Sequence, residues 1–273
     1  MMPKSVSILK ISIALFLSLP VVLNAQSIIS AKEKLRTAKH ERINQMIRSE
    51  EEGVPSFTRQ TVTGIKNHHD GWGLMFEKAF SKSPYKATVI QLEISEKQHR
   101  KEQKQSSALF YGRPFVYGKE NIFYQARLGV GRQVLLGGKT NKNGVAVYGI
   151  FVGGFSAGLA RPYYLTFQFG RDSIADYKYS ARFYDAFLNQ DPYAKIVGGT
   201  GLSKGWNEIK FTPGLYAKAS LRFDWARFNQ VVSALEVGFM ADMYSQKVIQ
   251  MIDLLGKTFF PTGFVSLNFG KRK

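Results

Sequence analysis

The sequence predicts an all-β protein: an antiparallel transmembrane β-barrel of about eight strands, with an N-terminal periplasmic α-helix. Three observations predict this architecture. Long stretches alternate between apolar and polar residues with a period of two, charged residues interrupt every long apolar stretch after the first 25 residues, and the chain contains no cysteine. Without disulfides or a spanning helix, a closed hydrogen-bonded sheet is the structure that could cross a bilayer.

Residues 1–25 have the pattern of a cleaved secretory signal peptide. Two lysines precede an apolar run from Ile11 to Leu23, and the small residue Ala25 suits cleavage before Gln26. The alternative, an uncleaved membrane anchor, would need roughly 20 apolar residues. We therefore expect an exported protein whose mature chain begins at Gln26.

The chain is strongly basic, with 38 lysines and arginines against 20 acidic residues and a net charge of +18. Cleavage would remove two of the lysines, which leaves 36 basic residues and a charge of +16. For an exported protein, the expected partners of this charge are outer-membrane lipid and lipopolysaccharide rather than nucleic acid. A need for solubility, together with lysines at the membrane interface, would account for the positive charge equally well.

Residues 26–57 are predicted to form a periplasmic helical arm. Ser30 and Glu33 match a capping box, apolar residues recur at roughly helical spacing through residues 30–52, and Gly53 and Pro55 end the pattern. This arm could lie on an anionic membrane face, plug the barrel mouth or remain solvated.

The barrel domain is expected over residues 58–273, and its clearest strand begins at Leu215. Apolar residues alternate with polar ones as far as Trp225, and the pattern resumes over 235–243 after a short connection at 228–230. These segments predict a β-hairpin. Six further segments carry weaker alternation: 72–80, 86–96, 121–135, 144–157, 161–169 and 257–270.

The polar face of these strands carries charged residues. The direction in which this face points distinguishes a soluble barrel from a membrane barrel. A soluble barrel such as a lipocalin turns its apolar face inward, whereas a membrane barrel turns it toward lipid and pairs its charges inside. Strand lengths near the 9 to 11 residues that a bilayer requires, and aromatic residues near strand ends, favour the membrane barrel. The predicted charge network of the barrel lumen comprises Glu93, Arg127, Lys218, Arg222, Asp224, Glu236 and Asp242.

The strand count also predicts which connections face outward. With both termini in the periplasm, the long segments 170–208 and 245–256 lie outside, as expected for such barrels. The equally long 97–120 segment falls on the periplasmic side. Either the count is off by one strand, or this segment folds into the lumen.

Several stretches resemble small outer-membrane barrel proteins of Bacteroidota. They are the leader ending in LNAQ, the strand GWGLMFEKAF, the stretch FYGRPFVYGKENIFYQARLGVGRQ and the closing GFVSLNFGKRK. The resemblance spans most of the mature chain and implies the fold and an outer-membrane location, but no reaction. Such barrels often end on an aromatic residue, whereas here four residues follow Phe269.

No catalytic, cofactor-binding or metal-binding constellation is predicted. His68, His69 and Asp70 cluster before the first predicted strand, which fits a solvated turn better than a metal or acid–base site. His99 lies near Ser106 and Ser107, without the arrangement of a nucleophile and its base. Aromatic and basic residues of the two long connections form a candidate surface for a ligand or partner: Arg113, Tyr117, Tyr177, Tyr179 and Tyr184.

The sequence thus predicts an outer-membrane barrel with a structural or interaction role in the cell envelope, and no catalysis is evident from it. In a barrel of eight strands the side chains fill the interior, which argues against an open channel. Two alternatives remain open: a lipid-modifying barrel enzyme, and a barrel subunit of an envelope or secretion assembly.

Overall fold

A computed structural model describes residues 57–106, 112–139, 144–169, 173–180, 195–252 and 254–273, together with isolated positions between 33 and 44. The chain divides into two units, Met1–Glu51 and Glu52–Lys273. The predicted helix at 30–52 lies outside the described residues apart from those isolated positions, and so does the predicted cleavage site. No helix in the described part of the chain is long and apolar enough to cross a bilayer.

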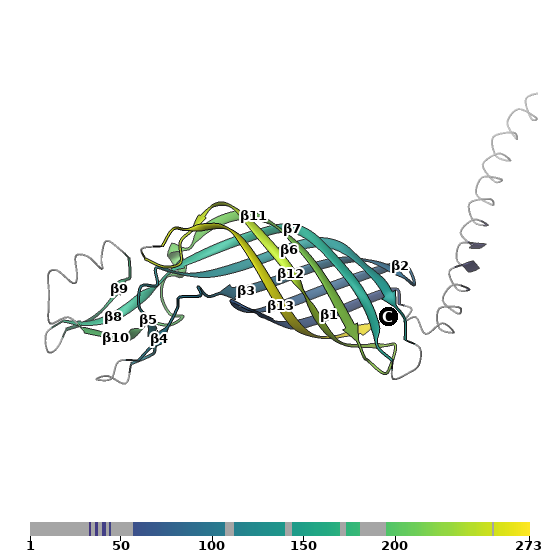
Figure 1. Ribbon diagram of the computed structural model, residues 1–273, viewed down its shortest axis with the longest axis horizontal. Coiled ribbons are helices and arrows are strands. Elements are labelled where there is room, and N and C mark those ends of the chain that lie inside the picture. Colours follow the sequence, from purple (N-terminus) through teal and green to yellow (C-terminus); the bar gives the residue numbers. More distant parts are fainter. Residues whose placement is uncertain are drawn as a thin grey trace, which may run out of the picture. The chain divides into compact units, whose positions relative to one another are not determined.

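The second unit contains a closed antiparallel barrel of eight strands, as predicted (Figure 1). Neighbouring strands follow the order β1–β2–β3–β6–β7–β11–β12–β13, and β13 closes the barrel by pairing with β1. The strands are β1 (Arg59–His68), β2 (Gly71–Ser83), β3 (Lys86–Lys97), β6 (Asn121–Gly137), β7 (Ala146–Pro162), β11 (Lys210–Asp224), β12 (Val231–Val248) and β13 (Lys257–Arg272).

The register fixes how wide the barrel is. Stepping from partner to partner around the sheet, a path that leaves β13 at Lys271 returns to β13 at Pro261, a stagger of ten residues (271 minus 261). Eight strands with this stagger tilt by about 40° from the barrel axis and enclose a space that side chains can fill.

The two faces of the barrel have inverted polarity compared with a soluble protein. Large apolar side chains point outward from every strand, and Phe239 and Phe155 are 78% and 74% exposed. Charged and amide side chains point inward and are buried, including Arg127, Arg222 and Glu236. The period of two places one class on each face because successive side chains of a strand point to opposite sides.

The strand number was predicted correctly, but one of the predicted strands was wrong. The first barrel strand is β1, which the sequence interpretation omitted because its outward positions include Thr61, Thr63 and Asn67 rather than apolar residues. The predicted strand at 161–169 does not belong to the barrel. Arg161 and Pro162 end β7, and the following residues form β8 (Tyr164–Phe169), the central strand of a separate sheet.

Adding β1 to the barrel and removing the 161–169 segment from it also changes the end of the barrel at which the 97–120 connection lies. An added strand before β2 moves the segment to the end of the barrel that holds the connections after β7 and β12. We call this end the loop end. The opposite end, the terminal end, holds the short connections after β2, β6 and β11, and there Thr58 and Lys273 share a backbone hydrogen bond of 2.7 Å.

The long connections of the loop end fold into small sheets (Figure 1). β8 pairs with β9 (Ser173–Lys178) and with β10 (Lys195–Gly199), and β4 (Lys104–Gln105) pairs with β5 (Phe115–Val116). A short 3-10 helix, η1 (Trp206–Glu208), precedes β11. We refer to the described residues of the three long connections, between β3 and β6, between β7 and β11, and between β12 and β13, as the cap.

Candidate functional site

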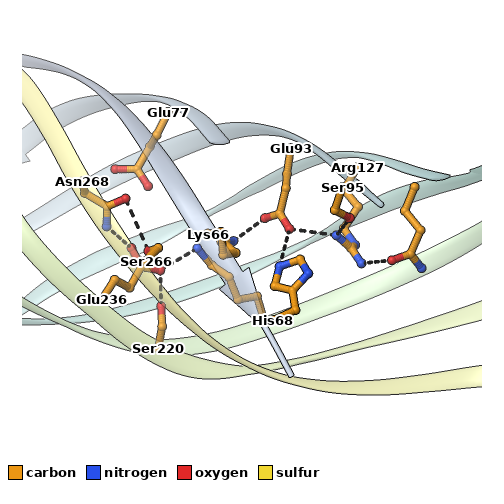
Figure 2. Close-up of polar contacts among 12 residues, drawn as sticks. Lys66, His68, Glu77, Glu93, Ser95, Arg127, Ser220, Glu236, Ser266 and Asn268 are labelled. Atoms are coloured by element: carbon orange, nitrogen blue, oxygen red, sulfur yellow. Dashed lines mark hydrogen bonds and ion pairs between the residues drawn. The ribbon is translucent and has the colours of Figure 1, made fainter. Parts of the chain in front are cut away.

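The middle of the barrel lumen holds an ion-paired network centred on Arg127. Its Nε and Nη2 atoms donate to both carboxylate oxygens of Asp242 at 2.7 and 2.8 Å, and its Nη1 donates to Glu93 at 2.8 Å. Glu93 also accepts from Lys66 of β1, and the His68 ring lies 3.5 Å away (Figure 2). Four strands, β1, β3, β6 and β12, are thereby connected across the lumen.

A second network surrounds Glu236, nearer the terminal end. Oε1 of Glu236 accepts from Lys218 at 2.9 Å, and Oε2 accepts from Arg222 at 2.8 Å. Arg222 also donates two hydrogen bonds of 2.6 and 2.7 Å to Glu77 across the lumen. Ser220 and Asn268 complete the shell around the Glu236 carboxylate, which has no exposed surface.

Each predicted lumen residue is buried inside the barrel, and the structure brings most of them together. Six of the seven belong to the two networks above, while Asp224 lies apart at the terminal end and pairs with Arg272. Sequence reasoning missed Lys66, Glu77 and Arg272 as partners. Lys66 was missed because β1 was missed; Glu77 could have been found from its place on the polar face of β2.

Aromatic rings fill the loop end of the lumen. Phe123, Tyr244 and Phe260 contact one another with ring centroids 5.4 to 5.8 Å apart, and all three are buried. Farther inside, the Tyr216 hydroxyl and the backbone oxygen of Gly153 occupy the space that a Cβ of Gly129 would need, so a larger residue there would displace them. Side chains therefore occupy the lumen from the aromatic cluster to the ion pairs.

The cap has its own apolar core beyond the barrel. Phe115, Tyr163, Leu165, Phe167 and Tyr179 are buried together, with Ile122 and Ile252. Two tyrosine hydroxyls fix the 112–118 segment over this core: Val116 donates to Tyr163 at 3.1 Å, and Gly118 donates to Tyr179 at 3.3 Å. Burial raises the pKa of Tyr163.

The predicted ligand or partner residues occupy different places in the cap. Tyr117 and Tyr179 meet with ring centroids 6.2 Å apart, but Tyr179 is buried whereas Tyr117 is 43% exposed. Tyr177 is partly exposed on β9, and Arg113 is exposed beside β10, where its carbonyl accepts from Gly199. Tyr184 lies outside the described residues.

Ion pairs connect segments of the cap on its outer surface. Lys204 pairs with Asp176, and Thr166 donates to the same carboxylate at 2.6 Å. The hydrogen bond from Lys204 is the main reason that the pKa of Asp176 is lowered. Glu208 accepts from Lys178 at 2.8 Å, which likewise lowers the pKa of this exposed carboxyl.

The histidines and serines do not form a catalytic pair among the described residues. His68 points into the lumen toward Glu93, while His69 is exposed and Asp70 pairs with Lys97. His68 and Ser220 line one outer groove, yet three strand spacings, about 14 Å, separate them in the sheet. No group of three His, Asp or Glu side chains within the described ranges could hold a metal ion.

No protein-family model matches the chain, and no curated protein is significantly similar to it in sequence. Three solved structures cover most of the chain at low identity. Ail, the attachment invasion locus protein of Yersinia pestis, was solved in complex with the heparin analogue sucrose octasulfate; it is 9% identical over 80% of this chain and 100% of Ail, with a TM-score of 0.38.

Neisserial surface protein A is 8% identical over 79% of this chain and 94% of its own, with a TM-score of 0.36. The N-terminal β-barrel domain of Pseudomonas aeruginosa OprF is 7% identical over 78% of this chain and 96% of the domain, with a TM-score of 0.34. At these identities and TM-scores, the similarities do not establish a shared function.

Proposed function

We propose that this protein is an outer-membrane β-barrel of a Gram-negative envelope, exported by a signal peptide cleaved after Ala25, with a structural or interaction role rather than a catalytic one. The observation that carries the proposal is the inverted polarity of the barrel. An outward surface rich in Phe, Leu, Ile and Val would be costly in water and is stable in lipid. The resemblance to Bacteroidota barrels supports the same location.

A soluble ligand-binding barrel would need the opposite arrangement. Its apolar side chains would line the lumen around a ligand. Here Arg127, Glu93 and Asp242 occupy the middle of the lumen and pair with one another. A buried ion pair is stable only when its hydrogen bonds are satisfied, which the closed barrel provides.

The barrel is proposed to be a closed anchor and not a diffusion channel. The aromatic cluster of Phe123, Tyr244 and Phe260 lies across the loop end of the lumen, and the two ion-pair networks follow it. A solute would have to break these contacts to pass.

The cap is the proposed interaction surface, and its position supports an outward-facing orientation. It assembles from the long connections, which face the cell exterior in outer-membrane barrels, while both ends of the barrel chain lie at the opposite end. Its exposed side chains mix aromatic and basic residues, among them Tyr117, Arg113 and Trp206. Lipopolysaccharide and a protein of the envelope are the partners that this chemistry fits.

The mature chain from Gln26 is expected to insert into phosphatidylcholine vesicles as a folded barrel. The folded form should migrate faster than the boiled form on a denaturing gel, because a closed hydrogen-bonded sheet resists detergent. Mass spectrometry of the native N-terminus and membrane fractionation would locate the cleavage site and the compartment. A chain recovered only in the soluble periplasmic fraction would contradict the proposal.

The cap is expected to unfold without the barrel when Tyr179 is replaced by alanine. Removing a buried aromatic ring from a small core costs about 3–5 kcal/mol, and this change also removes the hydroxyl that accepts from Gly118. Protease added outside whole cells should then cut the cap of Tyr179→Ala, while the barrel keeps its fast gel migration.

The matched control is Tyr177→Ala, because Tyr177 is a partly exposed tyrosine only two residues away, near the end of β9. Its protease pattern should equal that of the unmodified protein. Equal cleavage of both variants, or loss of the folded barrel in Tyr179→Ala, would show that the cap is not a separate folding unit.

A further inference from the structure

Exposed charge is segregated between the two ends of the barrel. In the described part of residues 57–273, the acidic side chains of the terminal half, Glu77, Asp224 and Glu236, are fully buried in ion pairs. The carboxylates with exposed surface lie toward the loop end or in the cap. Among the described residues, every charged side chain on the outer surface toward the terminal end is a cation: Arg59, Lys78, Lys86, Arg132, Arg227, Lys271 and Lys273.

Four of these cations lie on one continuous face. Lys271, Thr61 and Lys78 are direct neighbours across β13, β1 and β2, so the two lysines flank a threonine about 10 Å apart. One step closer to the terminal end, a second row runs from Arg59 through Phe80 and Thr88 to Arg132. None of the four cations forms an ion pair with another described residue.

An apolar groove begins directly beside the first row, on the side toward the middle of the barrel. Thr63 stands between Phe269 and Phe76 in the sheet, and because its side chain is short, the two rings leave a hollow over it. The groove has a volume of about 420 Å³. Its walls come from β13, β1, β2 and β3: Thr63, Gly64, Ile65, Leu74, Met75, Phe76, Leu92, Ile94 and Phe269.

We infer that this face binds one anionic glycerophospholipid of the periplasmic leaflet, with an acyl chain in the groove and the phosphate between Lys78 and Lys271. The inference rests on the proposed membrane location. Threonine hydroxyls at Thr61 and Thr88 supply neutral donors beside the cations. Two flexible lysine side chains can converge on an anion that lies between them.

The charge pattern selects an anionic lipid over a zwitterionic one. The four cations of this face, with no exposed acidic side chain near them among the described residues, would repel the ammonium group of phosphatidylcholine, whereas phosphatidylglycerol carries net negative charge. Long basic side chains on the lipid-facing surface can extend to the headgroup level while their stems stay in the hydrocarbon. The groove directly beside the row then receives an acyl chain of the same lipid.

The test is native mass spectrometry of the full mature chain in a nonionic detergent, titrated separately with dioleoylphosphatidylglycerol and dioleoylphosphatidylcholine. We expect one retained phosphatidylglycerol, bound about tenfold more tightly than phosphatidylcholine. The double variant Lys78→Gln, Lys271→Gln should bind the two lipids equally. The control Lys210→Gln, Lys247→Gln removes two exposed lysine charges at the loop end and should keep the preference.

Insertion into phosphatidylcholine vesicles, read by gel migration, separates failure of this inference from failure of the proposed function. If the barrel inserts but shows no preference for phosphatidylglycerol, only the lipid site is overturned. A preference that survives in the folded Lys78→Gln, Lys271→Gln variant, or that falls equally in the control, overturns it as well. A chain that inserts into no vesicle overturns both.

Discussion

Replacing Glu236 by alanine is expected to destabilise the inserted barrel by about 3–5 kcal/mol. The change removes the acceptor of Lys218 and one of the two acceptors of Arg222, and leaves their charges buried. For a buried charge without a partner, the cost of desolvation is no longer offset by the attraction of an opposite charge. The measurement is reversible unfolding in urea, in vesicles of one composition, followed by tryptophan fluorescence.

The control is Glu208→Ala, which removes an exposed carboxylate from the cap. It should leave the unfolding midpoint of the barrel unchanged, because exposed ion pairs contribute little to stability. A Glu236→Ala barrel as stable as the control would mean that water reaches the lumen and solvates the remaining cations. The network would then have no role in holding the strands together.

The substitution Val237→Arg is expected to destabilise the inserted barrel by about 2–4 kcal/mol if the position lies near the bilayer midplane. Val237 is an outward residue of β12 whose neighbours in the sheet are Leu221 and Val265, both apolar and outward. A guanidinium group at this place would lie in hydrocarbon far from either headgroup region. The same urea titration in vesicles measures the cost.

Ser245→Arg is the matched control, since Ser245 is exposed on the same strand near the loop end. Near the interface the same side chain should cost only about 0–1 kcal/mol. Equal costs at both positions would contradict the depth dependence that a spanning barrel requires. No cost at Val237 would indicate that water, and not lipid, covers this face.

The period-two pattern was sufficient to predict most of the barrel. From Leu215 in β11 and from Leu235 in β12, apolar residues recur at every second position on the outward face, so the side of the sheet follows directly from position. Strand β1 escaped prediction because Thr61, Thr63 and Asn67 give its outward face the same polarity as its inward one. Strand β8 was misassigned because a cap strand with its own apolar core shows the same alternation as a barrel strand.

The sequence by itself determined that the chain forms an antiparallel barrel with charged residues on one face, because alternation is a local property of each strand. Only the tertiary structure decided which charges meet: Arg222 with Glu77 and Arg127 with Asp242 lie more than 100 residues apart in the chain, and their pairing depends on closure and stagger. The cap and the row of Lys271, Thr61 and Lys78 likewise arise only when β13 closes on β1. Such contacts are set by register around a closed sheet, which no local pattern encodes.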